Sequence, residues 1–245
     1  MRLDRFLCEV GIGSRKEVKE IIRNGSVTVN GELAKQADMK IREDTDQVVC
    51  LGKTCLYQQF SYFILHKPSG VVTATKDDRD KTVMDCFTEA FGLMFPDRSV
   101  PTNLAPVGRL DKDTEGLLLI TNDGLLAHRL LSPAKHVDKT YYVRAMGQLS
   151  VEDIEPLCSG VDIGDETPTL PAKAEILCSN KDETELHLTI HEGRFHQIKR
   201  MLVAVGSQVI YLKRVQFGSL KLDDTLPVGA IREINVRLDN EKYFG

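Results

Sequence analysis

The sequence lacks the features that mark several large protein classes. None of its 245 residues falls in a long uninterrupted apolar run, so no segment is suited to span a bilayer. Residues 1–7 contain no apolar stretch of the kind found in signal peptides, and we expect a cytoplasmic protein. Neither the turn G-x-G-x-x-G nor the loop G-x-x-x-x-G-K-[ST] occurs, which argues against the usual dinucleotide and nucleoside-triphosphate sites. The sequence therefore indicates a soluble globular protein.

The cysteines form no metal-binding or redox motif. They are scattered, with no C-x-x-C pair and no Cys/His cluster at zinc spacing. We interpret them as reduced and mostly buried thiols, and we predict no metal site. They are Cys8, Cys50, Cys55, Cys86, Cys158 and Cys178.

The charge balance is slightly acidic, with a net charge of −4. This average argues against a nucleic-acid partner, because such proteins usually carry a basic surface. Two segments depart from the average: residues 191–214 contain five basic residues and one acidic residue, and residues 128–144 contain four and one. With a basic stripe near the N-terminus, these segments could form a discontinuous RNA track, with the acidic residues on the far face.

The first fifty residues predict a small module of helices and strands. Apolar residues at helical spacing indicate a helix over residues 3–10. Ser14 and Glu17 form a capping box for a second helix, which Gly25 would end. The pair Asn30–Gly31 after an alternating stretch is a strong hairpin signal, and further strands would follow through Val49.

The second predicted helix carries a basic stripe. At about 100° per residue, four cations fall within one quadrant beside the apolar face. A solvated surface is the usual meaning of such a stripe on an isolated helix. The segments Met1–Leu7, Ser14–Lys16 and Arg23–Gly31, however, resemble the alpha-L RNA-binding motif of the ribosomal protein S-four type. This resemblance implies contacts with the RNA backbone from Arg15, Lys16, Lys19 and Arg23.

A second domain follows a short linker. Residues 51–60 lose periodicity, so we assign residues 1–52 to the first domain, 53–60 to a linker and 61–245 to the second domain. A turn over residues 66–70 separates two extended stretches. Many strands with few helices between them predict an α+β fold on a large, mainly antiparallel sheet with flanking helices. The predicted strands are 62–65, 71–74, 117–121, 140–145, 172–178, 185–190, 208–215 and 231–236, and the predicted helices are 82–93, 125–131, 151–158 and 195–205.

A polar cluster around Asp111 precedes the apolar strand 117–121. Taken alone, such a cluster is most often a simple surface turn. The stretch Gly108–Gly124, however, is similar to the signature of the small-subunit ribosomal (RsuA-type) pseudouridine synthases and their large-subunit relatives. Three further stretches match that family in the same order: His66–Gly70, Lys139–Tyr141 and Glu192–Met201. The resemblance therefore implies a pseudouridine synthase domain over residues 61–245.

The resemblance also implies roles for single residues. Asp111 would be the nucleophile, Lys199 the fixed cation that keeps it ionised, and Tyr141 the ring that stacks on the target base and helps remove the ring-carbon proton. Only one of Tyr141 and Tyr142 can face the pocket, because neighbouring strand residues point to opposite sides. Leu212 would form the floor of the pocket. Substrate or RNA contacts are expected from Arg109, Arg194 and Lys67. Without the family motif, these residues would be read as ordinary core or surface positions, and we assign no catalytic role to His191 or His196.

The implied reaction needs no cofactor. Uridine must lose its bond from nitrogen to ribose, rotate its base and rejoin the ribose through a ring carbon. The carboxylate could attack the sugar or the uracil ring, or act as a base on the ribose, and the sequence does not choose among these routes. The target nucleotide would have to leave its stack first.

The expected substrate is one uridine of 16S ribosomal RNA, free or in a subunit assembly intermediate, and the expected enzyme is a monomer. The same chemistry on 23S RNA stays open, because the segment 91–106 is longer than the family pattern before the signature. A non-catalytic RNA-binding or assembly protein is a second alternative. A glycosidase that uses Asp111 and Asp113 as paired carboxylates is a third.

Overall fold

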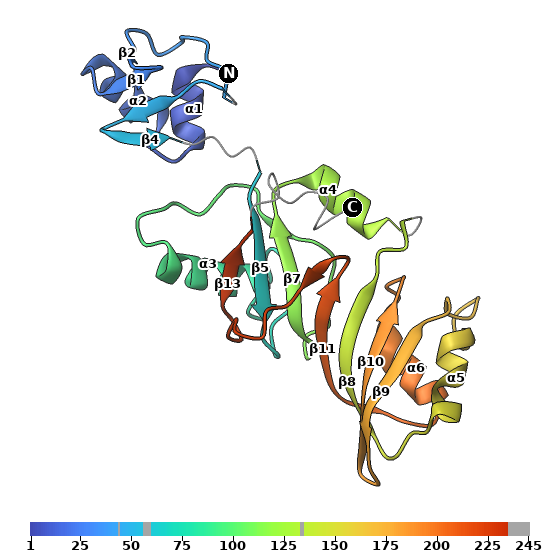
Figure 1. Ribbon diagram of the computed structural model, residues 1–245. Helices are drawn as coiled ribbons and strands as arrows, with labels where there is room; N and C mark the ends of the chain where they lie inside the picture. The colour runs from blue at the N-terminus through green and yellow to red at the C-terminus, as the bar shows by residue number, and fades with distance from the viewer. Residues whose placement is uncertain (44, 56–59, 133–134, 235–245) are drawn as a thin grey trace. The chain divides into compact units, whose positions relative to one another are not determined.

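The computed structural model describes residues 1–43, 45–55, 60–132 and 135–234 (Figure 1). The chain divides into two compact units between residues 60 and 61, and residues 97–99 are assigned to the first unit. Among the helices of these ranges, none has both the length and the apolar character needed to cross a membrane.

The N-terminal unit packs two helices on a small sheet. Its elements are α1 (Leu3–Glu9), α2 (Arg15–Arg23), β1 (Val27–Val29), β2 (Glu32–Leu33), β3 (Val48–Cys50) and β4 (Lys53–Cys55), with the antiparallel strand order β2-β1-β3-β4. The capping box is present, because the backbone N–H of Ser14 donates to the Glu17 carboxylate at 2.8 Å and Ser14 Oγ accepts from the Glu17 N–H. Asn30 and Gly31 have φ values of 52° and 84°, which suit the predicted tight hairpin.

The predicted linker begins too early. Residues Lys53–Cys55 form strand β4, which pairs with β3. Leu51 and Gly52 reverse the chain between these strands with φ values of 49° and 76°. Such a two-residue turn needs a left-handed backbone, which glycine accepts readily. Three of the predicted linker residues therefore belong to the N-terminal sheet, and residues 56–59 lie outside the described ranges.

The C-terminal unit is built on a large twisted sheet. Its strands are β5 (Tyr62–Lys67), β6 (Ala105–Pro106), β7 (Glu115–Thr121), β8 (Lys139–Met146), β9 (Lys173–Ser179), β10 (Glu183–Ile190), β11 (Val209–Phe217), β12 (Leu220–Lys221) and β13 (Ile231–Glu233). The main order is β13-β5-β7-β11-β8-β10-β9, while β6 pairs with β7 and β12 with β11. Within the described residues, β7 and β11 are the one parallel pair. The expected α+β fold on a mainly antiparallel sheet is thus confirmed.

Three helices contribute to one hydrophobic core with the sheet. They are α3 (Val83–Met94), α5 (Val151–Ser159) and α6 (Gln197–Ala204), whereas α4 (Gly124–Leu131) follows β7. Figure 1 shows α3 beside β13 and β5, and α5 and α6 beside the β8–β10–β9 end. Phe87 of α3 packs edge-on against Phe63 of β5, with 5.0 Å between ring centroids. Strand β10 alternates buried and half-buried residues, as expected for a sheet with one covered face.

The motif glycine Gly116 marks the closest approach of two strands. Its φ is 108°, and a Cβ atom there would lie 2.3 Å from the carbonyl oxygen of Arg214 on β11. Only glycine fits this approach, because any side chain would force the parallel pair β7–β11 apart. The close pairing of β7 with β11 places the loop before β7 next to β11.

Some predicted features differ from the structure. Arg214, expected in the basic RNA track, is 2% exposed and donates from Nε to the Leu117 carbonyl at 2.8 Å. Arg144, expected there as well, pairs with Glu183 at 2.5 Å. The stretch 71–74 is not a strand but contributes only a bridge from Val72 to Thr82.

Other local predictions need smaller adjustments. Two cysteines are buried, two are half-buried and two are exposed, so burial is less general than expected. Strand β5 continues through Lys67, so the turn predicted over residues 66–70 begins later. The last predicted strand residues, 235 and 236, lie outside the described ranges.

Candidate active site

The loop that carries Asp111 lies between β6 and β7. Its turn closes where the backbone N–H of Thr114 donates to the Asp111 carbonyl at 3.1 Å. The ammonium of Lys67, at the end of β5, donates to the carbonyl oxygens of Thr114 at 2.8 Å, Lys112 at 3.1 Å and Pro68 at 3.0 Å. One side chain therefore ties the loop to the sheet on both sides of Asp113.

Lys67 was predicted to contact substrate, and in the structure it faces the loop backbone instead. The residue is fully buried, and its ammonium bonds to the backbone of its own protein. Burial lowers the pKa of Lys67 to about 8, although Asp113 and Asp111 act in the opposite direction. Lys67 thus supports the position of the loop rather than facing the pocket.

Asp111 and Lys199 form an ion pair, with 3.2 Å between Oδ2 and Nζ. The side chain of Asp111 is 29% exposed. The same ammonium lies 2.6 Å and 2.9 Å from the two carboxylate oxygens of Asp113. Partial burial alone would lower the pKa of Lys199, but its hydrogen bonds to Asp113 and Asp111 outweigh this and raise it. Lys199 therefore stays charged beside Asp111.

Asp113 takes part in the same cluster. Its burial alone would raise its pKa, but the hydrogen bond from Lys199 and the attraction of that charge lower it. The sequence had suggested Asp113 only as a partner in a glycosidase pair. The structure instead places both carboxylates on one cation, so their negative charges are offset by Lys199 rather than held apart for acid and base roles.

A small cavity of about 80 Å³ opens beside this ion pair. Tyr141 of β8 and Leu212 of β11 line it, and they are 7% and 6% exposed. Tyr142 points to the other face of the sheet, where its hydroxyl donates to Glu185 at 2.7 Å. The remaining lining residues are Arg109, Leu110, Asp111, Thr114, Ile190, Gly193, Arg194, His196, Gln197, Ile198 and Lys199. An anion, a cation and an aromatic ring thus meet at one pocket.

The two arginines predicted to contact substrate differ in their surroundings. Arg109 is exposed and lines the cavity. Arg194 also lines the cavity, but its guanidinium donates to the Thr167 carbonyl at 2.6 Å, the Pro168 carbonyl at 2.8 Å and Glu192 at 2.9 Å. The guanidinium of Arg194 is therefore held by a neighbouring loop of the protein.

Lys199 lies in the first turn of α6. His196 precedes the helix with a left-handed φ of 48°, so the helix begins at Gln197, two residues later than the predicted start at residue 195. Gln197 is 4% exposed, and its side chain accepts from the Arg194 N–H at 3.0 Å and donates to Glu192 at 2.8 Å. These bonds fix the turn from which Lys199 projects.

Three pocket residues with polar side chains were given no role from the sequence. Thr114 is buried, and its hydroxyl has no hydrogen-bond partner within the described parts of the chain. His196 Nε2 lies 3.7 Å from the Asp111 carboxylate, and Gln197 lines the wall. Thr114 and Gln197 belong to the matched stretches, so the motifs themselves were the available signal. In the described ranges, no group of three or more histidine, cysteine or carboxylate side chains is arranged to hold a metal ion.

The N-terminal unit presents the predicted basic stripe. The side chains of Arg15, Lys16, Lys19 and Arg23 on α2 are all exposed. The apolar side of the same helix is buried through Val18 and Ile22. Four positive charges on one exposed side could contact phosphates, and this remains a prediction.

Comparison with known proteins identifies families for both units. Residues 61–204 match the family described as RNA pseudouridylate synthase, and residues 1–48 match the S4 domain. A Bacillus subtilis protein named uncharacterized RNA pseudouridine synthase YtzG is 47% identical over 96% of this chain and 95% of its own length. The ribosomal small subunit pseudouridine synthase A of Vibrio vulnificus is 40% identical over 95% of both chains.

Two further comparisons extend this result. The ribosomal large subunit pseudouridine synthase B of Bacillus subtilis is 37% identical over 95% of this chain and 91% of its own length. A crystal structure described as that of a pseudouridylate synthase covers 99% of both chains, with a TM-score of 0.66 and 33% identity. The likeness therefore spans the N-terminal unit as well as the sheet and its pocket.

Proposed function

The chain belongs to the RNA pseudouridylate synthase family, and we propose that it converts one uridine of 16S ribosomal RNA to pseudouridine with Asp111 as the nucleophile. The observation that carries this proposal is the pair of Asp111 and Lys199, 3.2 Å apart beside a pocket lined by Tyr141. It places a carboxylate and its counter-ion beside a ring on which a base can stack.

The residues of the pocket match the demands of the reaction. The bond between ribose C1′ and uracil N1 breaks, a bond from C1′ to C5 forms, the hydrogen on C5 leaves and N1 gains a proton. Asp111 supplies the carboxylate that attacks the ribose or the ring, or takes a proton from the ribose. Lys199 places its positive charge 3.2 Å from the Asp111 carboxylate. Tyr141 stacks on the base opposite Leu212 and assists removal of the C5 proton.

Several observations support ribosomal RNA as the substrate. Relatives at 40% and 37% identity carry names that refer to the small and the large ribosomal subunit. The exposed cations of α2 suit a phosphate backbone. Modification of a uridine in folded RNA requires that the nucleotide leave its stack, and the pocket offers Tyr141 in exchange. The large-subunit RNA is the second candidate, on account of the relative at 37% identity.

The proposal is tested with RNA labelled with tritium at C5 of uridine. Because C5 loses its hydrogen, each isomerisation releases one tritium to solvent. The purified chain is incubated separately with 16S and 23S transcripts and with subunit assembly intermediates. We expect release from one site of 16S RNA, and we expect Asp111→Asn to abolish it without loss of RNA binding. Asp182→Asn, the same change at an exposed turn, is the matched control and should leave release unchanged.

Each other outcome has a definite meaning. Full activity of Asp111→Asn would refute the nucleophile assignment. Release from 23S RNA alone would overturn the small-subunit target and leave the chemistry in place. RNA binding by the unaltered protein without release from any substrate would favour the non-catalytic assembly role.

A further inference from the structure

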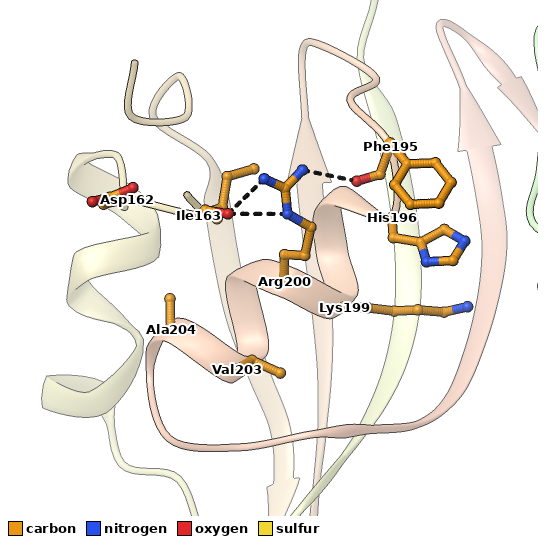
Figure 2. Close-up of a pocket in the computed structure, with 8 residues that line it drawn as sticks. All are labelled: Asp162, Ile163, Phe195, His196, Lys199, Arg200, Val203 and Ala204. Carbon is orange, nitrogen blue, oxygen red and sulfur yellow. Dashed lines mark hydrogen bonds between the residues drawn. The ribbon is translucent and has the colours of Figure 1, made fainter. Parts of the chain in front are cut away.

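A second, larger cavity lies next to the active-site pocket. It has a volume of about 510 Å³ and runs along the outer side of α6. Figure 2 shows Phe195, His196 and Lys199 projecting to the same side of the helix start, with Val203 one turn further along. Ile163, from the loop after α5, closes the opposite wall. The groove is mainly apolar, although it lies at the surface.

Phe195 gives this groove an exposed aromatic face. Phe195 is 75% exposed. One face of its ring stacks on the imidazole of His196, with ring centroids 3.9 Å apart and planes at 14°. His196 is held in a left-handed conformation, which is uncommon for a residue with a side chain. An exposed phenylalanine on a strained turn contributes little to folding, so a binding role accounts for it better.

The groove and the active-site pocket share two lining residues. His196 and Lys199 line both cavities, and His196 Nε2 lies 3.7 Å from the Asp111 carboxylate. A molecule in the groove would therefore lie directly beside a nucleotide in the pocket. An RNA chain that delivers one base to Asp111 would therefore bring the next nucleotide of the chain close to this groove.

A single arginine links the two walls of the groove. The Arg200 guanidinium donates to the Ile163 carbonyl, with Nε at 3.0 Å, and to the Phe195 carbonyl at 3.1 Å (Figure 2). It also pairs with Asp165. One arginine thus joins the two walls and holds them apart at a set width.

We propose that this groove binds the unpaired nucleobase adjacent to the target uridine, stacked on the exposed face of Phe195. The proposal rests on the proposed function, because it takes the target uridine to occupy the Asp111 pocket. Aromatic side chains bind unstacked bases in this way, since every base offers a flat π-face. The apolar wall, the fixed width and the shared edge with the pocket fit a planar base better than a protein side chain. Phe195 would thus hold the strand in register during isomerisation.

The experiment uses two single-stranded RNA dodecamers, each with one uridine in a run of cytidines. One carries the fluorescent base 2-aminopurine directly 5′ of the uridine, and the other carries it directly 3′. Stacking quenches 2-aminopurine, so the full chain should quench one of the two probes. Phe195→Leu should abolish the quenching and weaken binding by about 5- to 150-fold, the range expected for one stacked base. Phe195→Trp should retain both. Leu93→Ala, which truncates another exposed apolar residue of this unit, is the matched control.

The outcomes separate this proposal from the proposed function. Tritium release from ribosomal RNA reports the function and does not depend on the probes. If release occurs but neither probe is quenched, or if Phe195→Leu binds both probes as the unaltered protein does, the base subsite is refuted alone. If Phe195→Leu instead weakens binding to ribosomal subunits and leaves the dodecamers unaffected, the groove contacts another part of the subunit and the proposal is also overturned.

Discussion

Lys199 reaches Asp111 across the sheet, with its Nζ atom 3.2 Å from the carboxylate. The two residues come from α6 and from the loop before β7, which are far apart in sequence. Asp113 binds the same ammonium more closely, at 2.6 Å. A cation held by two carboxylates cannot leave easily, so Asp111 keeps a charged neighbour while the substrate enters.

Replacing Lys199 should therefore impair catalysis more than binding. In Lys199→Met, two carboxylates lose their shared cation, and we expect kcat to fall roughly 10²- to 10³-fold, the size typical of a lost electrostatic contact in an active site. The Kd for RNA should change by much less. Single-turnover tritium release and a binding titration measure the two effects. Lys173→Met, which removes an exposed lysine from β9, is the control. If Lys173→Met lowered kcat as much as Lys199→Met does, the effect would come from the net charge of the protein and not from the contact between Lys199 and Asp111.

Tyr141 and Tyr142 offer a matched pair of substitutions on opposite faces of β8. Tyr141→Phe keeps a ring in the pocket but removes its hydroxyl, and we expect C5 tritium release to slow about 10²-fold if that hydroxyl assists proton removal. Tyr142→Phe removes a hydrogen bond to Glu185 and should reduce the free energy of unfolding by about 1 kcal/mol, with activity unchanged. If Tyr141→Phe released tritium as fast as the unaltered protein, the hydroxyl would have no part in proton removal and the ring would act by stacking only.

Lys67 should make stability depend on pH in an unusual direction. Its pKa is about 8 in the folded protein and 10.5 in an unfolded chain. Between these values the unfolded chain holds the proton and the folded protein has lost it, so the unfolded state binds more protons and stability rises with pH. Relative to Lys67→Met, the free energy of unfolding of the unaltered protein should rise by about 3 kcal/mol from pH 8 to 10.5.

Urea titrations of both proteins at several pH values measure this difference. Other groups titrate in the same window, but they are common to both proteins and cancel in the comparison. If the difference in the free energy of unfolding between the two proteins did not change with pH, burial would not lower the pKa of Lys67.

The basic stripe of α2 should control the salt dependence of RNA binding. Arg15→Glu combined with Lys19→Glu removes two expected phosphate contacts, so the slope of log affinity against log salt should become shallower by about 1.4 to 1.8. The double change Lys35→Glu with Lys53→Glu alters the charge of the same unit equally at exposed positions away from α2. If both double variants change the slope alike, or if neither does, α2 has no special part in RNA contact.

Local features of the chain were predictable because their causes lie within a few residues. The capping box of Ser14 and Glu17 and the hairpin at Asn30–Gly31 depend on neighbours alone. The opposite directions of Tyr141 and Tyr142 follow from the two-residue period of a strand. The family resemblance then identified Asp111 and the matched stretches, and the family comparison confirms that resemblance.

The partners of long cationic side chains were not predictable in the same way. Lys67 was expected to meet substrate, but it ends on three carbonyl oxygens of its own chain. Arg214 was expected in an RNA track, but it is buried against Phe217, with its guanidinium carbon 5.0 Å from the ring centroid. A flexible cation can meet any acceptor that another segment brings within reach, and sheet pairing decides which segments those are.

The sequence by itself determined most of the secondary structure, the order of the two units and the chemical type of each pocket residue, since these depend on local periodicity and on residue identity. Only the tertiary structure decided that Lys199 is shared between Asp111 and Asp113, and that Phe195 stands exposed beside them. The physical reason is that such contacts exist only after β7, β8 and β11 have paired and α6 has packed on the sheet.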